Sequence, residues 1–266
     1  MPDPTSAALR RERGGIERTA PLELISLVLL LGAWQVLAML FPGRLFPTPV
    51  TVAVELWHHL TDGKLLADLG KTLSRAVLAF GIAMLLGTAI GISFGRSRFL
   101  DRLFSSWVVI GLNLPAIVIA IVLYIWLGLT EFALVLAVVL NKLPLVITTI
   151  REGVRSFARD YDDLARAYRL SFWRRMRLIW VPQLMPFVLA AARTGLSLIW
   201  KIVLVFEVLG SDGGVGFRIS VFFQFFDIKG ILSYSTAFIL VVFAFEYLVL
   251  RPLEGRLLRW RRGAAG

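Results

Sequence analysis

The chain has 266 residues, of which 58% are apolar and only 18% charged, and its lysines and arginines outnumber its acidic residues by 11. This much apolar sequence excludes a disordered chain, and the absence of cysteine excludes a disulfide scaffold, thiolate metal sites and cysteine nucleophiles. A nucleic-acid-binding domain could carry the positive charge, but not with this share of apolar residues. Both properties suit an integral membrane protein whose basic residues lie on one side of the bilayer.

Six stretches are long and apolar enough, or nearly so, to cross a hydrocarbon core of about 30 Å as helices of about 20 residues. None has the alternating pattern of a membrane barrel strand, so we expect an all-α protein. The first stretch is too long for the apolar core of a signal peptide, and we expect it to be retained. The six expected spans are Leu22–Phe41, Leu73–Phe94, Leu103–Leu127, Phe132–Ile150, Leu184–Leu209 and Ile231–Leu250.

The basic residues outside these spans set the expected orientation. With the N-terminus inside, 20 of them fall on the cytoplasmic side and at most 6 on the outer side. An excess of Lys and Arg marks cytoplasmic loops, so both termini are expected in the cytoplasm. We therefore expect a cytoplasmic tail over residues 1–20, a membrane domain over 21–255 and a second cytoplasmic tail over 256–266.

The longest cytoplasmic segment covers residues 151–183 and is named the coupling segment below. Its pattern is helical and charged, with aromatic residues such as Tyr168, Phe172 and Trp173 between the arginines. A structured projection with an apolar face must pack against something. The pattern favours a partner protein, although packing against the ends of the chain's own spans is also open.

Polar residues recur along one side of the fifth span. At about 100° per residue they share a stripe about 120° wide. Charges at membrane depth usually face a bundle interior or water, so the stripe predicts a pore wall or a polar helix seam. An internal pair of Lys201 with Glu207, or of Arg193 with a glutamate, serving packing alone, is the alternative. The candidate residues of the translocation path are Arg193, Ser197, Trp200, Lys201 and Glu207, with Asn113 and Asn141 as weaker additions.

Two prolines and a glycine-rich segment add local expectations. Pro115 and Pro144 should kink the third and fourth spans or leave carbonyls unpaired. The segment Gly210–Gly216 has the glycines of a phosphate-binding loop but lacks its Gly-Lys-Ser/Thr ending, so we expect a turn that re-enters the membrane edge. No metal-ligand or catalytic constellation stands out, which favours a transport path over an enzyme.

The coupling segment carries a pattern that resembles the hallmark of binding-protein-dependent ABC importer permeases. That hallmark is Glu-Ala-Ala, three residues, Gly, nine residues, Ile, one residue, then Leu-Pro. Here Asp163-Leu164-Ala165 opens the pattern, Ile179 stands at the expected distance, and Val181-Pro182 closes it. Arg169 takes the place of the glycine, which normally permits a bend between two short helices. Without this glycine, either another residue makes the bend between the two short helices or they form one continuous helix.

The resemblance extends over nearly all of the chain from Leu22 and is nearest to permeases of the nitrate, sulfonate and taurine type. No single stretch decides it, but together they are specific. The matching stretches are Leu45–Pro49, Leu65–Leu69, Thr72–Arg75, the glycines at 87, 91 and 95, Leu114-Pro115, Trp126–Gly128, Trp200-Lys201, Glu207–Gly210, Gly214–Gly216 and Leu253–Trp260.

The resemblance implies a six-helix type I importer permease of the bacterial inner membrane that pairs with a second copy of itself. It implies a dimer of separate ATP-binding subunits, which hold ATP and Mg, and an extracytoplasmic solute-binding protein; this chain itself would hold no cofactor and would bind no nucleic acid. ATP binding would open the path outward, and hydrolysis would reset it. The implied ATPase-coupling residues are Asp163, Leu164, Ala165, Arg166, Ala167, Tyr168, Arg169, Leu170 and Ser171.

The substrate and two other function classes stay open. Positive charge at Arg193 and Lys201 favours a small anion such as a sulfonate, taurine, nitrate or a carboxylate, while related permeases also serve vitamin precursors. A free-standing secondary transporter would need its own coupling-ion site and often shows an inverted repeat, and it would leave the arginine-rich coupling segment unexplained. The third class is a membrane enzyme or assembly scaffold, and no catalytic group supports it.

Overall fold

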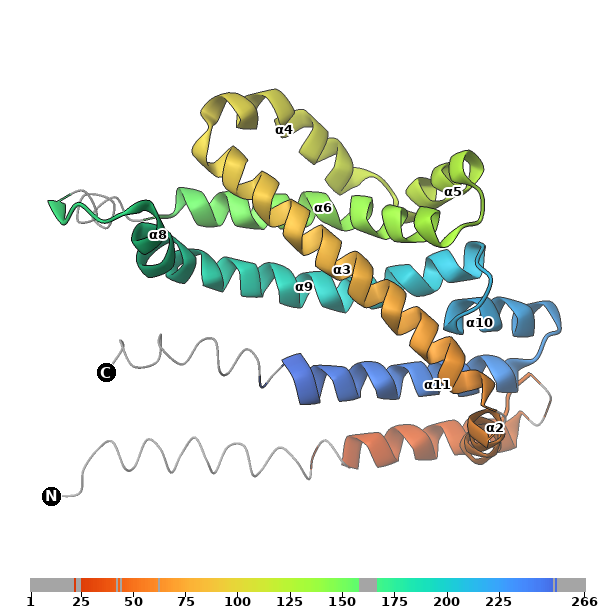
Figure 1. Ribbon diagram of the computed structural model, residues 1–266. Coiled ribbons are helices and arrows are strands. Elements are labelled where there is room, and N and C mark those ends of the chain that lie inside the picture. The colour runs from red at the N-terminus through yellow and green to blue at the C-terminus, as the bar shows by residue number, and fades with distance from the viewer. Residues whose placement is uncertain are drawn as a thin grey trace, which may run out of the picture.

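The computed structural model describes residues 22, 25–41, 43, 45–61, 63–157, 167–250 and 252. All regular structure within these residues is helical, which confirms the all-α expectation for the described part of the chain. The helices are packed in one layer of long rods crossed by α3, as Figure 1 shows. Asp163, Leu164, Ala165 and Arg166 of the predicted coupling helix lie outside the described residues.

Four of the expected spans are helices long and apolar enough to cross a membrane. They are α3 (Lys64–Arg96), α6 (Glu131–Arg155), α9 (Val181–Leu209) and α11 (Ile228–Phe245). The helix α9 is preceded by the short α8 (Phe172–Arg175) and the π-helical turn η1 (Met176–Trp180), and α11 continues into a second π-helical turn, η2 (Glu246–Leu250).

The third expected span is not one straight helix. It consists of α4 (Arg98–Asn113) and α5 (Ala116–Leu127), which meet at an angle of 99°. Leu114 and Pro115 between them are extended, with ψ angles of 124° and 130°. A residue before proline avoids helical backbone and the proline has no N–H to donate, so the predicted kink becomes a full break.

Pro144 behaves differently, because it lies inside α6 without ending that helix. The hydroxyl of Thr148 donates a hydrogen bond of 2.9 Å to the carbonyl of Pro144, so a side chain supplements the helical hydrogen bonds around the proline. Neighbouring helices and hydroxyl side chains commonly accommodate proline in this way within membrane helices.

Shorter helices complete the described fold. Residues Ile25–Leu40, at the position of the first expected span, form an apolar helix shorter than the other candidates. The helices α2 (Pro49–Thr61) and α10 (Val215–Gln224) lie near the right-hand ends of α9 and α11 in Figure 1. By length and composition, the described helices supply four membrane spans, or five when the bent pair counts as one.

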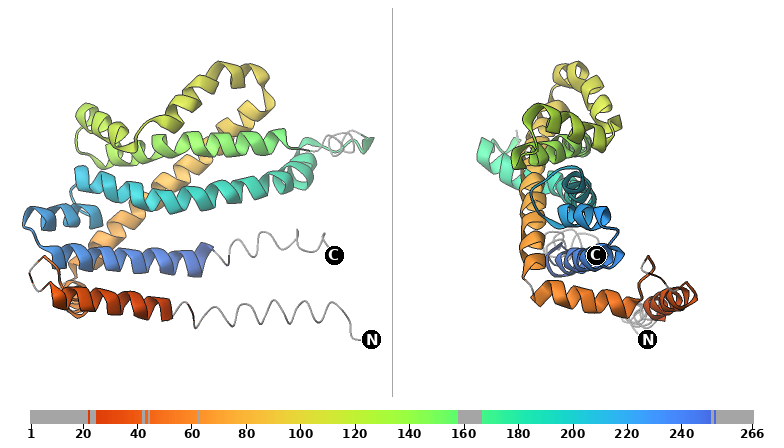
Figure 2. Two further views of the ribbon diagram at one scale, coloured as in Figure 1. Left: turned by 180° about the vertical axis from the view of Figure 1, so that it is seen from behind. Right: turned by 90° about the vertical axis from the view of Figure 1, so that its right-hand side faces the viewer.

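The long helix α3 crosses the others obliquely. In the right-hand view of Figure 2 it stands upright while α6, α9 and α11 are seen nearly end-on. Glycines permit its close approach to α6: a Cβ atom at Gly91 would lie 2.9 Å from the Ile147 carbonyl oxygen, and one at Gly87 would lie 2.6 Å from Val146 Cβ. Gly95 is crowded in the same way by Val154. Small residues four apart let two membrane helices pack backbone to backbone.

Candidate functional site: a polar pocket on α9 and an ion network at its end

One side of α9 is exposed and carries the predicted polar stripe. Arg193, Ser197 and Lys201 all lie on this side, one turn apart. Together with residues of α11 they border a pocket of about 700 Å³. The lining of this pocket comprises Arg193, Thr194, Ser197, Trp200, Lys201, Leu204, Phe238, Ile239, Val242, Phe243 and Glu246.

Trp200 forms the floor of the same pocket. Its side chain is 4% exposed, and its ring meets the rings of Phe238 and Phe245 on α11 edge to face, with centroids 6.4 and 5.5 Å apart. The lining carries two basic side chains and a single carboxylate, that of Glu246, so the pocket has a net positive charge. Structure thus brings four of the predicted path residues to one pocket that combines positive charge with aromatic surface.

Glu207, the fifth predicted path residue on α9, lies elsewhere. Its side chain is fully buried and does not border the pocket. The carboxylate accepts hydrogen bonds from Thr72 Oγ1, from Arg75 Nη1 and from the backbone N–H of Gly216. The pair with Lys201 that the sequence left open is therefore not formed, because Glu207 turns toward α3 and α10.

Arg75 is the centre of an ion network at this end of the molecule. Its Nη1 donates to Glu207 Oε1 and to the Gly213 carbonyl, each at 2.6 Å. Its Nε donates to Glu131 Oε2 at 2.6 Å, Nη2 donates to the other oxygen of the same carboxylate, and Nη2 also reaches Asp212 Oδ1 at 3.1 Å. One guanidinium therefore joins α3 to α6, to α9 and to the loop after α9. A planar fork of five donors suits this arrangement.

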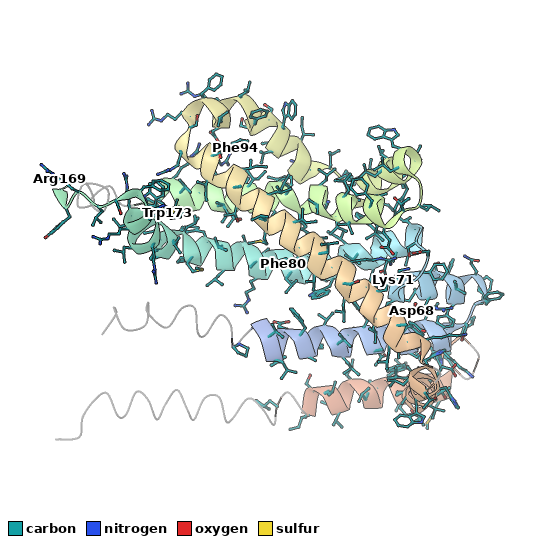
Figure 3. The ribbon with its side chains drawn as sticks, viewed as in Figure 1. Asp68, Lys71, Phe80, Phe94, Arg169 and Trp173 are labelled. Carbon is teal, nitrogen blue, oxygen red and sulfur yellow. The ribbon has the colours of Figure 1, made fainter. Side chains whose placement is uncertain are left out.

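Asp68 extends the network toward α10 and α11. Its Oδ1 accepts the backbone N–H of Gly214 at 3.1 Å, while Oδ2 accepts Arg218 Nε at 2.8 Å and the Tyr234 hydroxyl at 3.3 Å. The N–H of Val215 donates to Thr72 Oγ1 at 2.8 Å. The amides of the glycine-rich loop thus bind the chain's own oxygen atoms. Figure 3 places Asp68 and Lys71 together near α10.

The network reaches the surface through Lys71 and Asp212, whose charged atoms lie 2.8 Å apart. The hydrogen bond from Lys71 holds the pKa of the Asp212 carboxyl below its ordinary value. Sequence reasoning missed this network, although a signal was present. Asp68, Lys71 and Arg75 recur at helical spacing on one face of α3, close to the end of an apolar span.

The two asparagines that were weaker path candidates are not brought to the pocket. Asn113 is exposed at the end of α4, where its Nδ2 donates to the Val109 carbonyl at 2.8 Å. Asn141 is half-buried in α6. Neither belongs to the pocket lining. In the described residues, no three His, Asp or Glu side chains are placed to hold a metal ion.

The described part of the coupling segment ends in a projecting tip, opposite Asp68 in Figure 3. Arg169 has a φ angle of +46°, so the bend is made at the position where the family has glycine, and by a residue with a Cβ atom. Tyr168 and Trp173 on either side of it are 73% and 79% exposed. The neighbouring predicted coupling residues Ala167, Leu170 and Ser171 belong to the same tip.

Known proteins share the sequence pattern and the fold of this chain. Residues 83–251 match the family model described as binding-protein-dependent transport system inner membrane component. The putative aliphatic sulfonates transport permease protein SsuC of Bacillus subtilis is 26% identical over 98% of this chain and 96% of its own length. The riboflavin transport system permease protein RibX of Chloroflexus aurantiacus is 28% identical over 89% of this chain and 88% of its own length.

A solved amino acid ABC transporter shares the fold with a TM-score of 0.62 and 19% identity, covering 76% of this chain and 97% of that one. The resemblance to ABC importer permeases, including those for sulfonates, is thereby confirmed. The chain belongs to the family of binding-protein-dependent transport system inner membrane components.

Proposed function

We propose that this chain is the transmembrane subunit of an ATP-driven importer and that the pocket on α9 is part of the translocation path for a small anion. The observation that carries the proposal is the exposed row of Arg193, Ser197 and Lys201 along one side of α9 in a permease-family chain. Ionisable groups on a membrane helix usually line a substrate pathway or a helix seam. In a complex, this row would face the second copy of the chain across the path.

The tip of the coupling segment supports a contact with an ATP-binding subunit. Tyr168, Phe172 and Trp173 are all more than half exposed, and arginines stand between and beside them. Exposed aromatic rings with arginine are the composition of protein interface centres. In this proposal the partner subunit binds ATP and Mg, so this chain is not itself the enzyme.

The remaining parts of the proposal follow from the same assignment. The chain crosses the bacterial inner membrane six times, with both termini in the cytoplasm, and it acts as a homodimer. Two ATP-binding subunits bind its coupling segments, and a solute-binding protein delivers substrate from the outside. The apolar helix Ile25–Leu40 would serve as the first span, and the bent pair α4–α5 would serve as the third.

Reconstitution tests this function directly. The purified chain is placed in liposomes with and without its ATP-binding subunit, and uptake of methanesulfonate, taurine or nitrate is measured in the presence of the solute-binding protein. We expect uptake only with the ATP-binding subunit and ATP. Uptake by the chain alone, without ATP, would show a secondary transporter and contradict the proposal.

The substrate class is tested by the charge of the pocket. Lys201→Gln removes one of its two basic groups, and Lys229→Gln, on an exposed site of α11 outside the pocket, is the matched control. Hydrogen bonds to charged groups are strong, so we expect Lys201→Gln to lower anion uptake about tenfold. The relative RibX favours riboflavin, a neutral compound, as a second candidate. Uptake of riboflavin that is insensitive to Lys201→Gln would support that candidate.

A further inference from the structure

The start of α9 is held to the end of α3 by a buried tryptophan. Trp180 is 8% exposed, and the guanidinium carbon of Arg96, the last residue of α3, lies 3.4 Å from the centre of its ring. Arg175 of α8 lies 5.0 Å from the same ring, and Phe172 meets it edge to face at 6.1 Å. Tryptophan offers the most favourable ring face for such a cation, and Arg96 itself is exposed. Trp180, which is itself part of the coupling segment, thus contacts both α8 and the end of α3.

The backbone route from the coupling segment into α9 is weak by comparison. The residues before α9 form the π-helical turn η1, in which Val181 N–H bonds back to the Met176 carbonyl. Pro182 and Pro186 follow, and neither has an N–H for the helical ladder. A π-turn and missing ladder bonds are the usual places where a helix bends. A push on α8 would therefore bend this joint rather than move α9 as a rod.

The helix α3 is better suited to carry such a push. It is helical over 33 residues, from Lys64 to Arg96. Beyond its contact with Trp180, it is fastened to the far end of α9 through Arg75 and Glu207, and to the loop after α9 through Asp68 and Gly214. The two arginines are 21 positions apart, about 32 Å along the helix. A rigid rod thus connects the coupling segment with the loop at the other end of the pocket-bearing helix.

We propose that Trp180 is a positioning residue that passes a displacement of the coupling segment to α3, and through α3 to the loop 210–216. This inference rests on the proposed function, because it assumes that an ATP-binding subunit moves the coupling segment. It adds a specific route for the motion. Trp180 is needed for its flat ring face, which keeps Arg96 in place while the joint beside it bends.

The test compares variants of the full complex in proteoliposomes. Trp180→Phe keeps an aromatic face, Trp180→Leu removes it, and Arg96→Met removes the cation while keeping a long side chain. We expect Trp180→Leu and Arg96→Met each to lower uptake per ATP hydrolysed about two- to fivefold, which is the range expected for a cation–π contact made by an exposed cation such as Arg96. Trp180→Phe should stay within about twofold of the wild type, since it retains the π face.

Copurification with the ATP-binding subunit is measured in parallel. It should be unchanged in these variants, because Trp173 and the other exposed rings of the tip are intact. Trp107→Leu, which alters a tryptophan 71% exposed on α4, is the control and should leave uptake per ATP unchanged. The double variant Trp180→Leu/Arg96→Met should lose less than the product of the two single losses, because the contact between these two side chains is already removed in each single variant.

Three outcomes would overturn the transmission role: wild-type uptake per ATP in Trp180→Leu, an equal loss in Trp180→Phe, or additive losses in the double variant. Each leaves the proposed function standing. A wild-type complex that hydrolyses ATP without uptake of any tested solute would instead contradict the proposed function.

Discussion

Arg75 Nη1 and Glu207 Oε1 lie 2.6 Å apart in a place where both side chains are nearly inaccessible to water, with exposures of 3% and 0%. The pair joins two helices whose residues are 132 positions apart in the chain. Burying two charges costs desolvation energy, and this is offset only when the remaining donors and acceptors are also bonded. Here Thr72 and Gly216 donate further hydrogen bonds to the Glu207 carboxylate. Glu131 and Gly213 accept further hydrogen bonds from the Arg75 guanidinium.

Removal of one partner of this pair should be far worse than removal of both. Arg75→Met leaves the Glu207 carboxylate buried without its cation, and we expect it to lower the free energy of unfolding by about 3–5 kcal/mol. Adding Glu207→Leu should recover part of that loss. Thermal unfolding of the detergent-solubilised chain measures both effects. An unchanged unfolding temperature for Arg75→Met would contradict the role given to the pair.

The loop after α9 requires glycine at position 214. Its φ angle is +102°, and a Cβ atom there would lie 2.4 Å from Glu207 Oε1. Gly214→Ala should therefore displace the buried carboxylate and lower stability by several kcal/mol, on the order of the loss for a broken buried pair. Gly63→Ala is the control, since φ is +76° but no atom lies within 4 Å. It should cost only the backbone strain, about 1–2 kcal/mol. Equal losses of stability in the two variants would show that backbone strain alone, and not the contact with Glu207, causes the loss.

Close packing of α3 on α6 makes a second pair of glycine variants informative. A Cβ atom at Gly91 would meet the Ile147 carbonyl oxygen at 2.9 Å, whereas a Cβ atom at Gly81 on the same helix would meet nothing within 4 Å. We expect Gly91→Ala to destabilise by about 1–3 kcal/mol through overpacking, and Gly81→Ala to be neutral or slightly stabilising. Unfolding temperatures of the two variants give the comparison. A Gly91→Ala chain as stable as Gly81→Ala would rule out the close approach of the helices.

The bend at Arg169 predicts an order among substitutions. Glycine and asparagine accept a φ angle of +46° more readily than other residues, while valine resists it and proline fixes φ near −65°. Arg169→Gly and Arg169→Asn should therefore preserve binding of the ATP-binding subunit, and Arg169→Val and Arg169→Pro should weaken it at least about tenfold if the bend positions the tip. Copurified ATP-binding subunit is the readout. If binding of the ATP-binding subunit depended on the charge of residue 169 and not on its backbone freedom, this explanation would be contradicted.

Hydropathy and proline placement predicted most of the membrane-spanning architecture. Each of the six expected spans overlaps a described helix, and four of them coincide with helices long and apolar enough to cross a membrane, because burial in lipid demands long apolar runs that are visible in sequence. The bend at Pro115 was predicted as a kink, but its extent was not. A proline shows where helical hydrogen bonds are lost, while the packing around it decides the angle.

The stripe on α9 shows what periodicity can and cannot provide. The angles between side chains were predicted well, since Arg193, Ser197 and Lys201 share the exposed side. Trp200 and Glu207 lie about 20–40° beyond Arg193, on the opposite edge of the stripe from Lys201, and that edge is buried. A helical wheel gives relative directions, but only the positions of α3, α6 and α11 decide where the exposed side ends. Periodicity therefore groups Glu207 with the other residues of the predicted translocation path, whereas in the structure its side chain lies in the ion network and not in the pocket.

The sequence separation within the ion network also has a consequence for biogenesis. Arg75 is synthesised 132 residues before Glu207. At about 5–20 residues per second, the arginine leaves the ribosome roughly 7–26 s earlier than its buried partner. During that interval α3 carries a cation that is not yet neutralised by the carboxylate of α9. Glu131 of α6 follows Arg75 after 56 positions and supplies the first carboxylate, so ribosome-bound chains that end before residue 131 should hold α3 more shallowly in the membrane than full-length chains.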